Sequence, residues 1–103
     1  MLVNRERLTI LRDEIGEDGF DDVIAMFLRE SDEVVARLTA AGDGQMNEAD
    51  LHFLKGNAMT LGLDDLAELC RTAAAGKPVA VALLRDVYAQ SRGAFLAGRM
   101  ARA

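Results

Sequence analysis

The sequence predicts an all-α protein: an antiparallel up-down four-helix bundle with a short additional N-terminal helix. Apolar residues recur at spacings of three and four along the chain, as amphipathic helices require, and period-two alternation is scarce. The connections between the expected helices are short, which places consecutive helices antiparallel. With 103 residues, the chain is expected to form a single domain over residues 1–103.

The N-terminal helix is expected over about residues 4–15. Asn4 can cap it, because a short polar side chain accepts hydrogen bonds from the unpaired N–H groups of the first turn. Gly16 can end it, since glycine adopts left-handed backbone conformations at little cost. The apolar face of this helix consists of Leu8, Leu11 and Ile15.

The first helix of the bundle is expected over about residues 18–41. Acidic residues gather between positions 17 and 22, where they favour the positive end of the helix dipole. A break at Gly42-Asp43-Gly44 follows. Its apolar stripe consists of Val23, Phe27, Val34 and Leu38, widened by Ile24, Leu28, Ser31 and Val35.

The second bundle helix is expected over about residues 47–62, starting near Asn47. The third is expected over about 64–75, with Asp64 as its cap. The core stripe of the second is Leu51, Leu54, Ala58 and Leu61, and that of the third is Leu66, Leu69, Cys70 and Ala73.

The last bundle helix is expected over about residues 79–98, after a turn at Gly76-Lys77-Pro78. Pro78, the only proline, suits the first position of a helix, where its missing N–H is not needed. The apolar residues assigned to this helix are Val79, Leu83, Leu84, Val87 and Ala94.

The charge of the chain argues against two classes of partner. A net charge of −5 disfavours nucleic acid and anionic membrane, because both attract cationic surfaces. Residues 1–50 carry a net charge of −8 and residues 51–103 a net charge of +3. The less acidic half suits an anionic ligand or partner, although a chance division of solvated surface charge is the alternative.

The cellular setting predicted by the sequence is the cytoplasm. Cys70 is the only cysteine, so no internal disulfide is possible and a reducing compartment is expected. Charges at residues 5–7 argue against a signal peptide, and no apolar run approaches the roughly 20 residues that span a bilayer. Met1 and the early start of the first helix favour a free-standing protein.

The single histidine of the chain, His52, is predicted to face solvent. On a helical wheel with about 100° per residue, the core residue Leu61 lies about 180° from His52. Lys55, Gly56 and Met59 fall within about 60° of His52 and share its face, as neighbours one or two turns apart should.

These residue types on one exposed face point to phosphoryl chemistry. A solvent-facing neutral imidazole is a nucleophile suited to neutral pH. Lys55 can attract a phosphoryl group and stabilise its charge. Gly56 costs the helix about 1 kcal/mol relative to alanine and leaves room beside His52 for another protein's backbone. A packing histidine, a solvated lysine and a glycine used for close helix packing are the alternatives.

At these residues the chain resembles a known family. The string HFLKG at residues 52–56, followed by Leu61-Gly62, resembles the signature of histidine-containing phosphotransfer (HPt) domains, roughly H-x-[LI]-K-G-x-[SA]-x-x-[LIV]-G. Ala58 matches the small position, and residues 66–70 resemble the LxxLC segment that follows in the family. Asn57, directly after Gly56, is a departure, because serine or another small residue is common at that position in the family. The resemblance covers about residues 8–95.

The resemblance implies a phosphorelay carrier in two-component signal transduction. His52 would be the phosphoacceptor, through Nε2, Lys55 would assist electrostatically and Gly56 would give steric access. The partners implied are response-regulator receiver domains, including the receiver of a hybrid histidine kinase. Mg²⁺ would be held by the receiver, so no cofactor is expected in this chain, and one histidine and one cysteine do not make a metal centre.

The chain is expected to be a stoichiometric carrier and not an enzyme, because it contains no nucleotide-binding loop. It is expected to be monomeric, since no heptad seam is present. Met59, Glu48 and Met26 are expected to contact the partner, with gap-filling in the bundle as the alternative for the methionines. The resemblance also implies a polar residue on the following helix that orients the histidine; Arg71 and Thr72 are candidates, but no motif identifies the orienting residue.

Two other functions are open at this stage. A non-catalytic helical docking module would bind a receiver or a histidine kinase without phosphotransfer. A purely structural four-helix bundle would not explain a glycine on the outer face. The presence of His52, Lys55 and Gly56 together favours the carrier over both.

Overall fold

The computed structural model describes residues 1–42 and 46–101, with side chains as far as residue 98. These residues form five helices and no strand, which confirms the predicted all-helical class. The helices are α1 (Arg5–Ile15), α2 (Glu17–Ala41), α3 (Glu48–Leu61), α4 (Asp64–Ala74) and α5 (Val81–Ala101).

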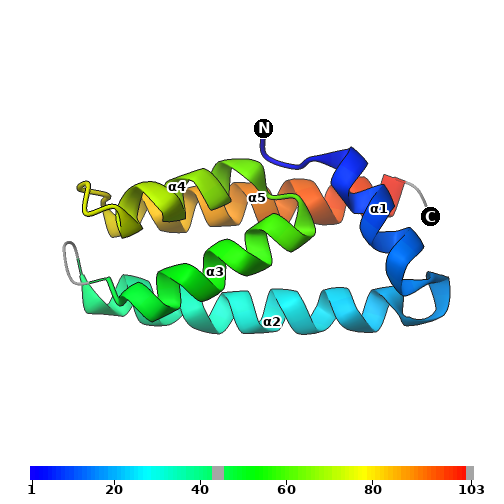
Figure 1. Ribbon diagram of the computed structural model, residues 1–103, viewed down its shortest axis with the longest axis horizontal. Coiled ribbons are helices and arrows are strands. Elements are labelled where there is room, and N and C mark those ends of the chain that lie inside the picture. The colour runs from blue at the N-terminus through cyan, green and yellow to red at the C-terminus, as the bar shows by residue number, and fades with distance from the viewer. Residues whose placement is uncertain (43–45, 102–103) are drawn as a thin grey trace.

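Helices α2, α3, α4 and α5 form a closed ring of contacts. α2 packs against α3 and α5, and α4 packs against the same two helices. α1 contacts α2 and α3 and lies across the end of the bundle at which α2 begins (Figure 1). Asp43 and Gly44, the second half of the predicted break after α2, lie outside the described residues, but Gly42 ends α2 with a φ of 86°.

Local signals explain where α1 and α3 begin. The side chain of Asn4 accepts a hydrogen bond from the backbone N–H of Arg7 at 3.1 Å. The side chain of Asn47 accepts one from the backbone N–H of Asp50 at 3.0 Å. The predicted cap at Asn4 and the predicted start of α3 near Asn47 are therefore confirmed, and the Asn47 cap determines where the helix carrying His52 starts.

The predicted cap of α4 is wrong. Leu63 occupies the N-cap position of α4, and no side chain caps it. Asp64 is already the first helical residue, because the chain has closed the α3–α4 turn through a hydrogen bond from Leu63 N–H to the carbonyl of Ala58 at 2.7 Å. The Asp64 carboxylate accepts instead from the Asn4 side chain at 3.3 Å.

The start of α5 also differs from the prediction. Its backbone hydrogen bonds begin at the carbonyl of Ala80, which accepts from Leu83 and Leu84 at 3.1 and 3.2 Å. Pro78 therefore precedes the helix and does not occupy its first position. Residues 76–80 are needed to cross from α4 to α5, and the proline favours extended backbone just before it.

The core is built from all five helices, and on α5 it includes residues that the sequence interpretation did not assign. The inward stripe follows a spacing of four, three and four residues: Leu84, Tyr88, Ser91 and Phe95, all buried. Of the apolar residues assigned to this helix from the sequence, Leu84 is buried, but Leu83 is 48% exposed. Apolar residues flank the true stripe on both sides, so the pattern allowed either rotation, and the two aromatic rings select the one observed.

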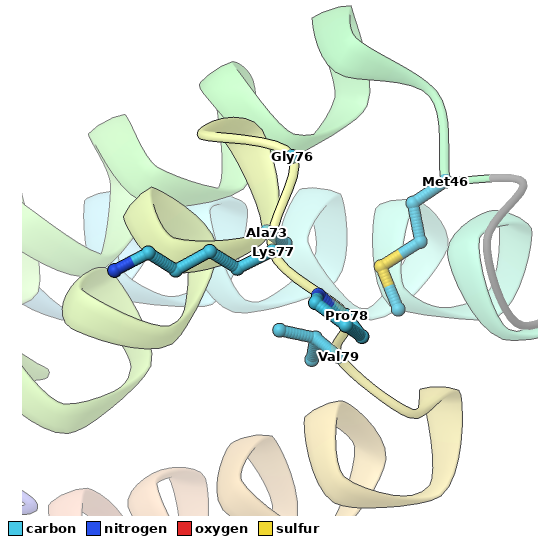
Figure 2. Close-up of a pocket in the computed structure, with 6 residues that line it drawn as sticks. All are labelled: Met46, Ala73, Gly76, Lys77, Pro78 and Val79. Carbon is cyan, nitrogen blue, oxygen red and sulfur yellow. The ribbon is translucent and has the colours of Figure 1, made fainter.

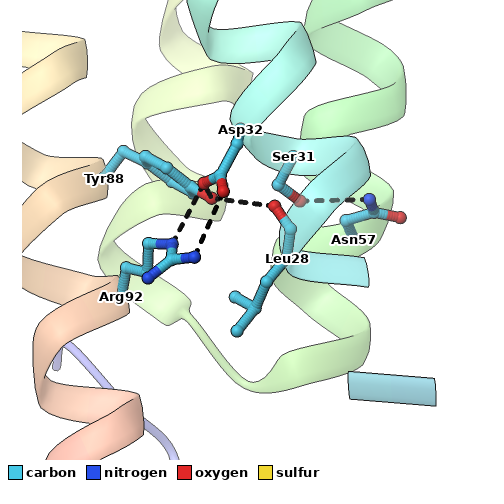
Figure 3. Close-up of polar contacts among 6 residues, drawn as sticks. All are labelled: Leu28, Ser31, Asp32, Asn57, Tyr88 and Arg92. Atoms are coloured by element: carbon cyan, nitrogen blue, oxygen red, sulfur yellow. Dashed lines mark hydrogen bonds and ion pairs between the residues drawn. The ribbon is translucent and has the colours of Figure 1, made fainter. Parts of the chain in front are cut away.

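A polar cluster joins α2 to α5 in the middle of the bundle (Figure 3). Arg92 donates from Nε and Nη2 to the two carboxylate oxygens of Asp32, at 3.0 and 3.1 Å. The Tyr88 hydroxyl donates to the same carboxylate. Because a guanidinium pairs with a carboxylate in one planar geometry, this partly exposed cluster favours one placement of α5 against α2.

Candidate functional site

The outer face of α3 carries the predicted site residues. Leu51, Leu54, Ala58 and Leu61 are all buried, as predicted for its core stripe, so the opposite face of the helix meets solvent. His52 and Gly56 are exposed there, as the helical wheel predicts, and Lys55 is half-buried.

His52 opens onto a groove between α3 and α4. The groove has a volume of about 350 Å³ and is lined by Glu48, Ala49, Leu51, His52, Lys55 and Ala74. Three side chains that carry or can carry charge therefore meet in one concave site, all from α3. α4 contributes only the small side chain of Ala74, which leaves space opposite the imidazole.

The polar residues of α4 are engaged away from this groove. Arg71 forms an ion pair with Glu68 at 2.6 Å, and the hydroxyl of Thr72 donates to the carbonyl of Glu68 at 3.0 Å. Neither lines the groove with His52. Among the described residues, no hydrogen bond holds the His52 side chain, so its ring nitrogens are available to an incoming group.

Lys55 lies on the α4 side of His52. Its charge acts on the thiol of Cys70, which is fully buried on α4. Burial raises the pKa of Cys70 to about 12, and the positive charge of Lys55 opposes that shift only in part. Cys70 is therefore a neutral core residue, as predicted.

Gly56 is an open position. A Cβ atom added there meets no atom within 4 Å outside its own helix backbone. Close packing of two helices therefore does not explain this glycine, and that alternative is excluded. The missing side chain leaves free surface one turn from His52, where another protein can approach.

The structure adds one residue to the surface around His52 that the sequence interpretation did not single out. Phe53 is 41% exposed, although aromatic rings are usually buried. It follows the histidine directly and lies about 100° further round the helix. The signal available in the sequence was an aromatic residue at the variable position of the motif.

The two methionines differ in their distance from His52. Met59 on α3 is 54% exposed, and Met26 on α2 is 42% exposed. Contacts between Ser31 and Asn57 and between Arg37 and Asp50 show that α2 and α3 run in opposite directions. In that register His52 is level with about residue 35 of α2, so Met26 lies about 14 Å further along the axis.

Met26 is therefore not beside the imidazole. In the same register Met59 is level with about residue 29 of α2, only about 5 Å along the axis from Met26. Along the helix axis, Met59 therefore lies between Met26 and His52. Glu48, the third predicted contact residue, is exposed and lies in the groove with His52.

A second hollow, of about 310 Å³, lies where α4 leads into α5 (Figure 2). It is lined by Met46, Ala73, Gly76, Lys77, Pro78 and Val79. Figure 2 shows the Lys77 side chain extending away from Met46. Among the described residues, no histidine, cysteine or serine lines this hollow, in contrast to the groove at His52.

Other kinds of site are not found in the part of the chain that the structure describes. Within residues 1–42 and 46–101, no three His, Cys, Asp or Glu side chains come together as metal ligands. Over the same residues, no helix is both long and apolar enough to cross a membrane.

Comparison with known proteins identified one family. The model of a family described as "Hpt domain" matches residues 22–94, which is well over half of the chain and includes His52, Lys55 and Gly56. No curated protein and no solved structure matched the chain.

Proposed function

The chain belongs to the Hpt domain family, whose members carry phosphoryl groups between receiver domains, and we propose that it is a phosphorelay carrier in two-component signal transduction. It accepts a phosphoryl group on His52 from the aspartate of one receiver and passes it to another. The observation that carries this proposal is the position of the only histidine, exposed beside Lys55 in an open groove.

The transfer follows from the groups in the groove. A ring nitrogen of His52, which we assign as Nε2, attacks the phosphorus of the aspartyl phosphate. The N–P bond forms while the P–O bond to aspartate breaks, and the aspartate leaves as a carboxylate. The proton on Nδ1 stays on the ring. Lys55 attracts the phosphoryl oxygens and offsets their charge. The next receiver reverses these steps.

Docking of the receiver is assigned to the outer face of α3. Phe53 and Met59 supply exposed apolar surface on either side of Gly56 along the helix. Exposed aromatic and methionine side chains around an open position suit a transient protein interface. Met26 extends this surface on α2, and Glu48 contacts the partner from the groove.

The remaining parts of the proposal concern partners and setting. The partners are response-regulator receivers and the receiver of a hybrid histidine kinase, and the Mg²⁺ for the transfer is held by the receiver. We propose a monomer in the cytoplasm, with no nucleic-acid or membrane partner, consistent with a net charge of −5 and a single thiol. The ring of contacts among α2–α5 supports an antiparallel up-down arrangement.

The test is a phosphotransfer assay with a panel of radiolabelled phosphorylated receivers and Mg²⁺. We expect acid-labile, base-stable label on the wild-type protein and none on the His52→Gln variant. Circular dichroism spectra of the two proteins should coincide, because His52 is exposed. If receivers bind but no label is transferred, the protein is a docking module and the proposal is wrong.

Lys55→Gln refines the same assay. This variant removes the charge of the side chain and keeps a polar group on a slightly shorter chain, so binding should change little while transfer slows by about tenfold or more. An unchanged transfer rate would remove Lys55 from the proposed mechanism.

A further inference from the structure

A buried hydrogen bond connects the helix of the site to α2. The side-chain amide of Asn57 donates from Nδ2 to the hydroxyl oxygen of Ser31 at 3.1 Å (Figure 3). Ser31 is 2% exposed and Asn57 is 7% exposed. They are two of the three buried polar residues in the described part of the chain, the third being Ser91.

This bond is the buried directional contact of the α2–α3 interface, whereas the other one, from Arg37 to Asp50, lies at the exposed edge. The buried face of α3 otherwise consists of leucine and alanine side chains, whose contacts tolerate small rotations and shifts. A hydrogen bond forms only within a narrow range of distance and angle. Because breaking it would leave both polar groups buried without a partner, one rotation of α3 is favoured.

This rotation determines where His52 points. Asn57 follows His52 by five residues, which places it about 140° further round α3. Any turn of α3 that moves Asn57 away from Ser31 moves the imidazole through the same angle relative to Ala74 across the groove. Figure 1 shows α3 inclined to α2, so contact along the whole length of the two helices does not fix that angle.

We infer that Ser31 and Asn57 are a positioning pair, which sets the rotation of α3 and thereby aims His52 and Lys55 at the incoming receiver. The inference rests on the proposed function and assigns roles to two residues that touch neither the imidazole nor the partner. It also gives a reason for asparagine at a position where the family signature commonly has a small residue.

The neighbouring residue on α2 provides the matched control. Asp32 binds Tyr88 and Arg92 on α5, away from α3. Tyr88→Phe removes one hydroxyl from that cluster, as Ser31→Ala removes one from the positioning pair. Each variant removes hydrogen bonding at the same turn of α2, but only Ser31→Ala removes a hydrogen bond to α3.

The first experiment is a double-mutant cycle on the rate of phosphoryl transfer from a receiver at saturating concentration. Ser31→Ala and Asn57→Ala should each slow transfer about tenfold, since small misplacements of a reacting group have effects of this size. The double variant should be no slower than either single one, because both remove the same bond. Tyr88→Phe should change the rate less than about twofold.

The second experiment reports the orientation of α3 without phosphoryl transfer. Residual dipolar couplings of the α3 backbone amides, relative to those of α2, should change in Ser31→Ala and stay at wild-type values in Tyr88→Phe. Because Ser31→Ala is a small truncation, this variant is expected to fold.

The outcomes separate the two proposals. Additive rate effects in the cycle, or unchanged dipolar couplings in Ser31→Ala, would overturn the positioning role. If the wild type accepts no phosphoryl group, the proposed function fails, and the dipolar couplings alone then decide whether Ser31 and Asn57 orient α3.

Discussion

At the scale of single residues, Gly56 separates helix stability from function. Alanine at this position meets no neighbouring atom and favours the helix by about 1 kcal/mol. We expect Gly56→Ala to raise the free energy of unfolding by about that amount and to slow phosphoryl transfer at low receiver concentration. Urea denaturation and the transfer assay measure the two effects.

Gly93 is the control for this prediction. It also lies inside a helix, is exposed, and has no atom within 4 Å of an added Cβ, but it is on α5. Gly93→Ala should stabilise the protein like Gly56→Ala and leave transfer unchanged. Equal transfer rates in the two variants would show that no partner needs the space at Gly56.

Ser91 is a second informative residue, because its hydroxyl is fully buried and makes no hydrogen bond in the described structure. A buried hydroxyl without a partner has lost its hydration and gained nothing in return. Ser91→Ala should therefore raise the free energy of unfolding by about 1 kcal/mol. Destabilisation of the variant in urea denaturation would show that the hydroxyl is satisfied in solution.

At the scale of elements, the turn between α3 and α4 holds the N-terminal segment. Gly62 ends α3 with a φ of 75°, and its carbonyl accepts from the backbone N–H of Asn4 at 2.6 Å. A Cβ at Gly62 would lie 2.8 Å from the carbonyl oxygen of Asn4, which is backbone and has little freedom to move. The second glycine of the family signature thus serves the docking of α1.

Substitution of Gly62 should destabilise the protein more than substitution of Gly16. Gly16 has a φ of 91° and a ψ of 155°, a backbone region almost confined to glycine, and open space around it, so Gly16→Ala carries only the backbone strain, about 2 kcal/mol. Gly62 is in the left-handed region, which costs alanine about 1 kcal/mol, and the clash with Asn4 brings the total to about 3 kcal/mol. Chemical denaturation of both variants tests this difference, and equal losses would mean that the N-terminal segment moves aside freely.

At the scale of the whole molecule, two buried groups that can lose a proton, the thiol of Cys70 and the hydroxyl of Tyr88, predict loss of stability in alkaline solution. Burial raises the pKa of Cys70 to about 12. Burial, and then the hydrogen bond to Asp32, raise the pKa of Tyr88 above its ordinary value, against the opposing effect of Arg92. Both groups hold their protons more tightly in the folded state than in the unfolded chain.

Their contribution to stability is therefore complete below about pH 8.5 and decreases as the pH rises through the unfolded-state pKa values, about 8.5 for cysteine and 10 for tyrosine. Urea midpoints between pH 7 and 11 should fall steadily. The decline should be shallower in Cys70→Ala and in Tyr88→Phe. A midpoint independent of pH over this range would contradict the burial of both groups.

Much of the architecture was predictable because its signals are local. Asn4 and Asn47 cap the N–H groups of their own first turns, and Gly16 and Gly62 relax the backbone where helices end. The prediction that Asp64 caps α4 was wrong because a polar residue before an apolar run resembles a cap. Only the closed α3–α4 turn shows that the helix has already begun at Asp64.

The sequence by itself determined the helices, the outward direction of His52 and the open position at Gly56, since all three depend on the period of a single helix. The tertiary structure decided the rotation of α5, the groove opposite Ala74 and the pairing of Ser31 with Asn57. These depend on how one helix lies against another, and that is settled by side chains far apart in the sequence.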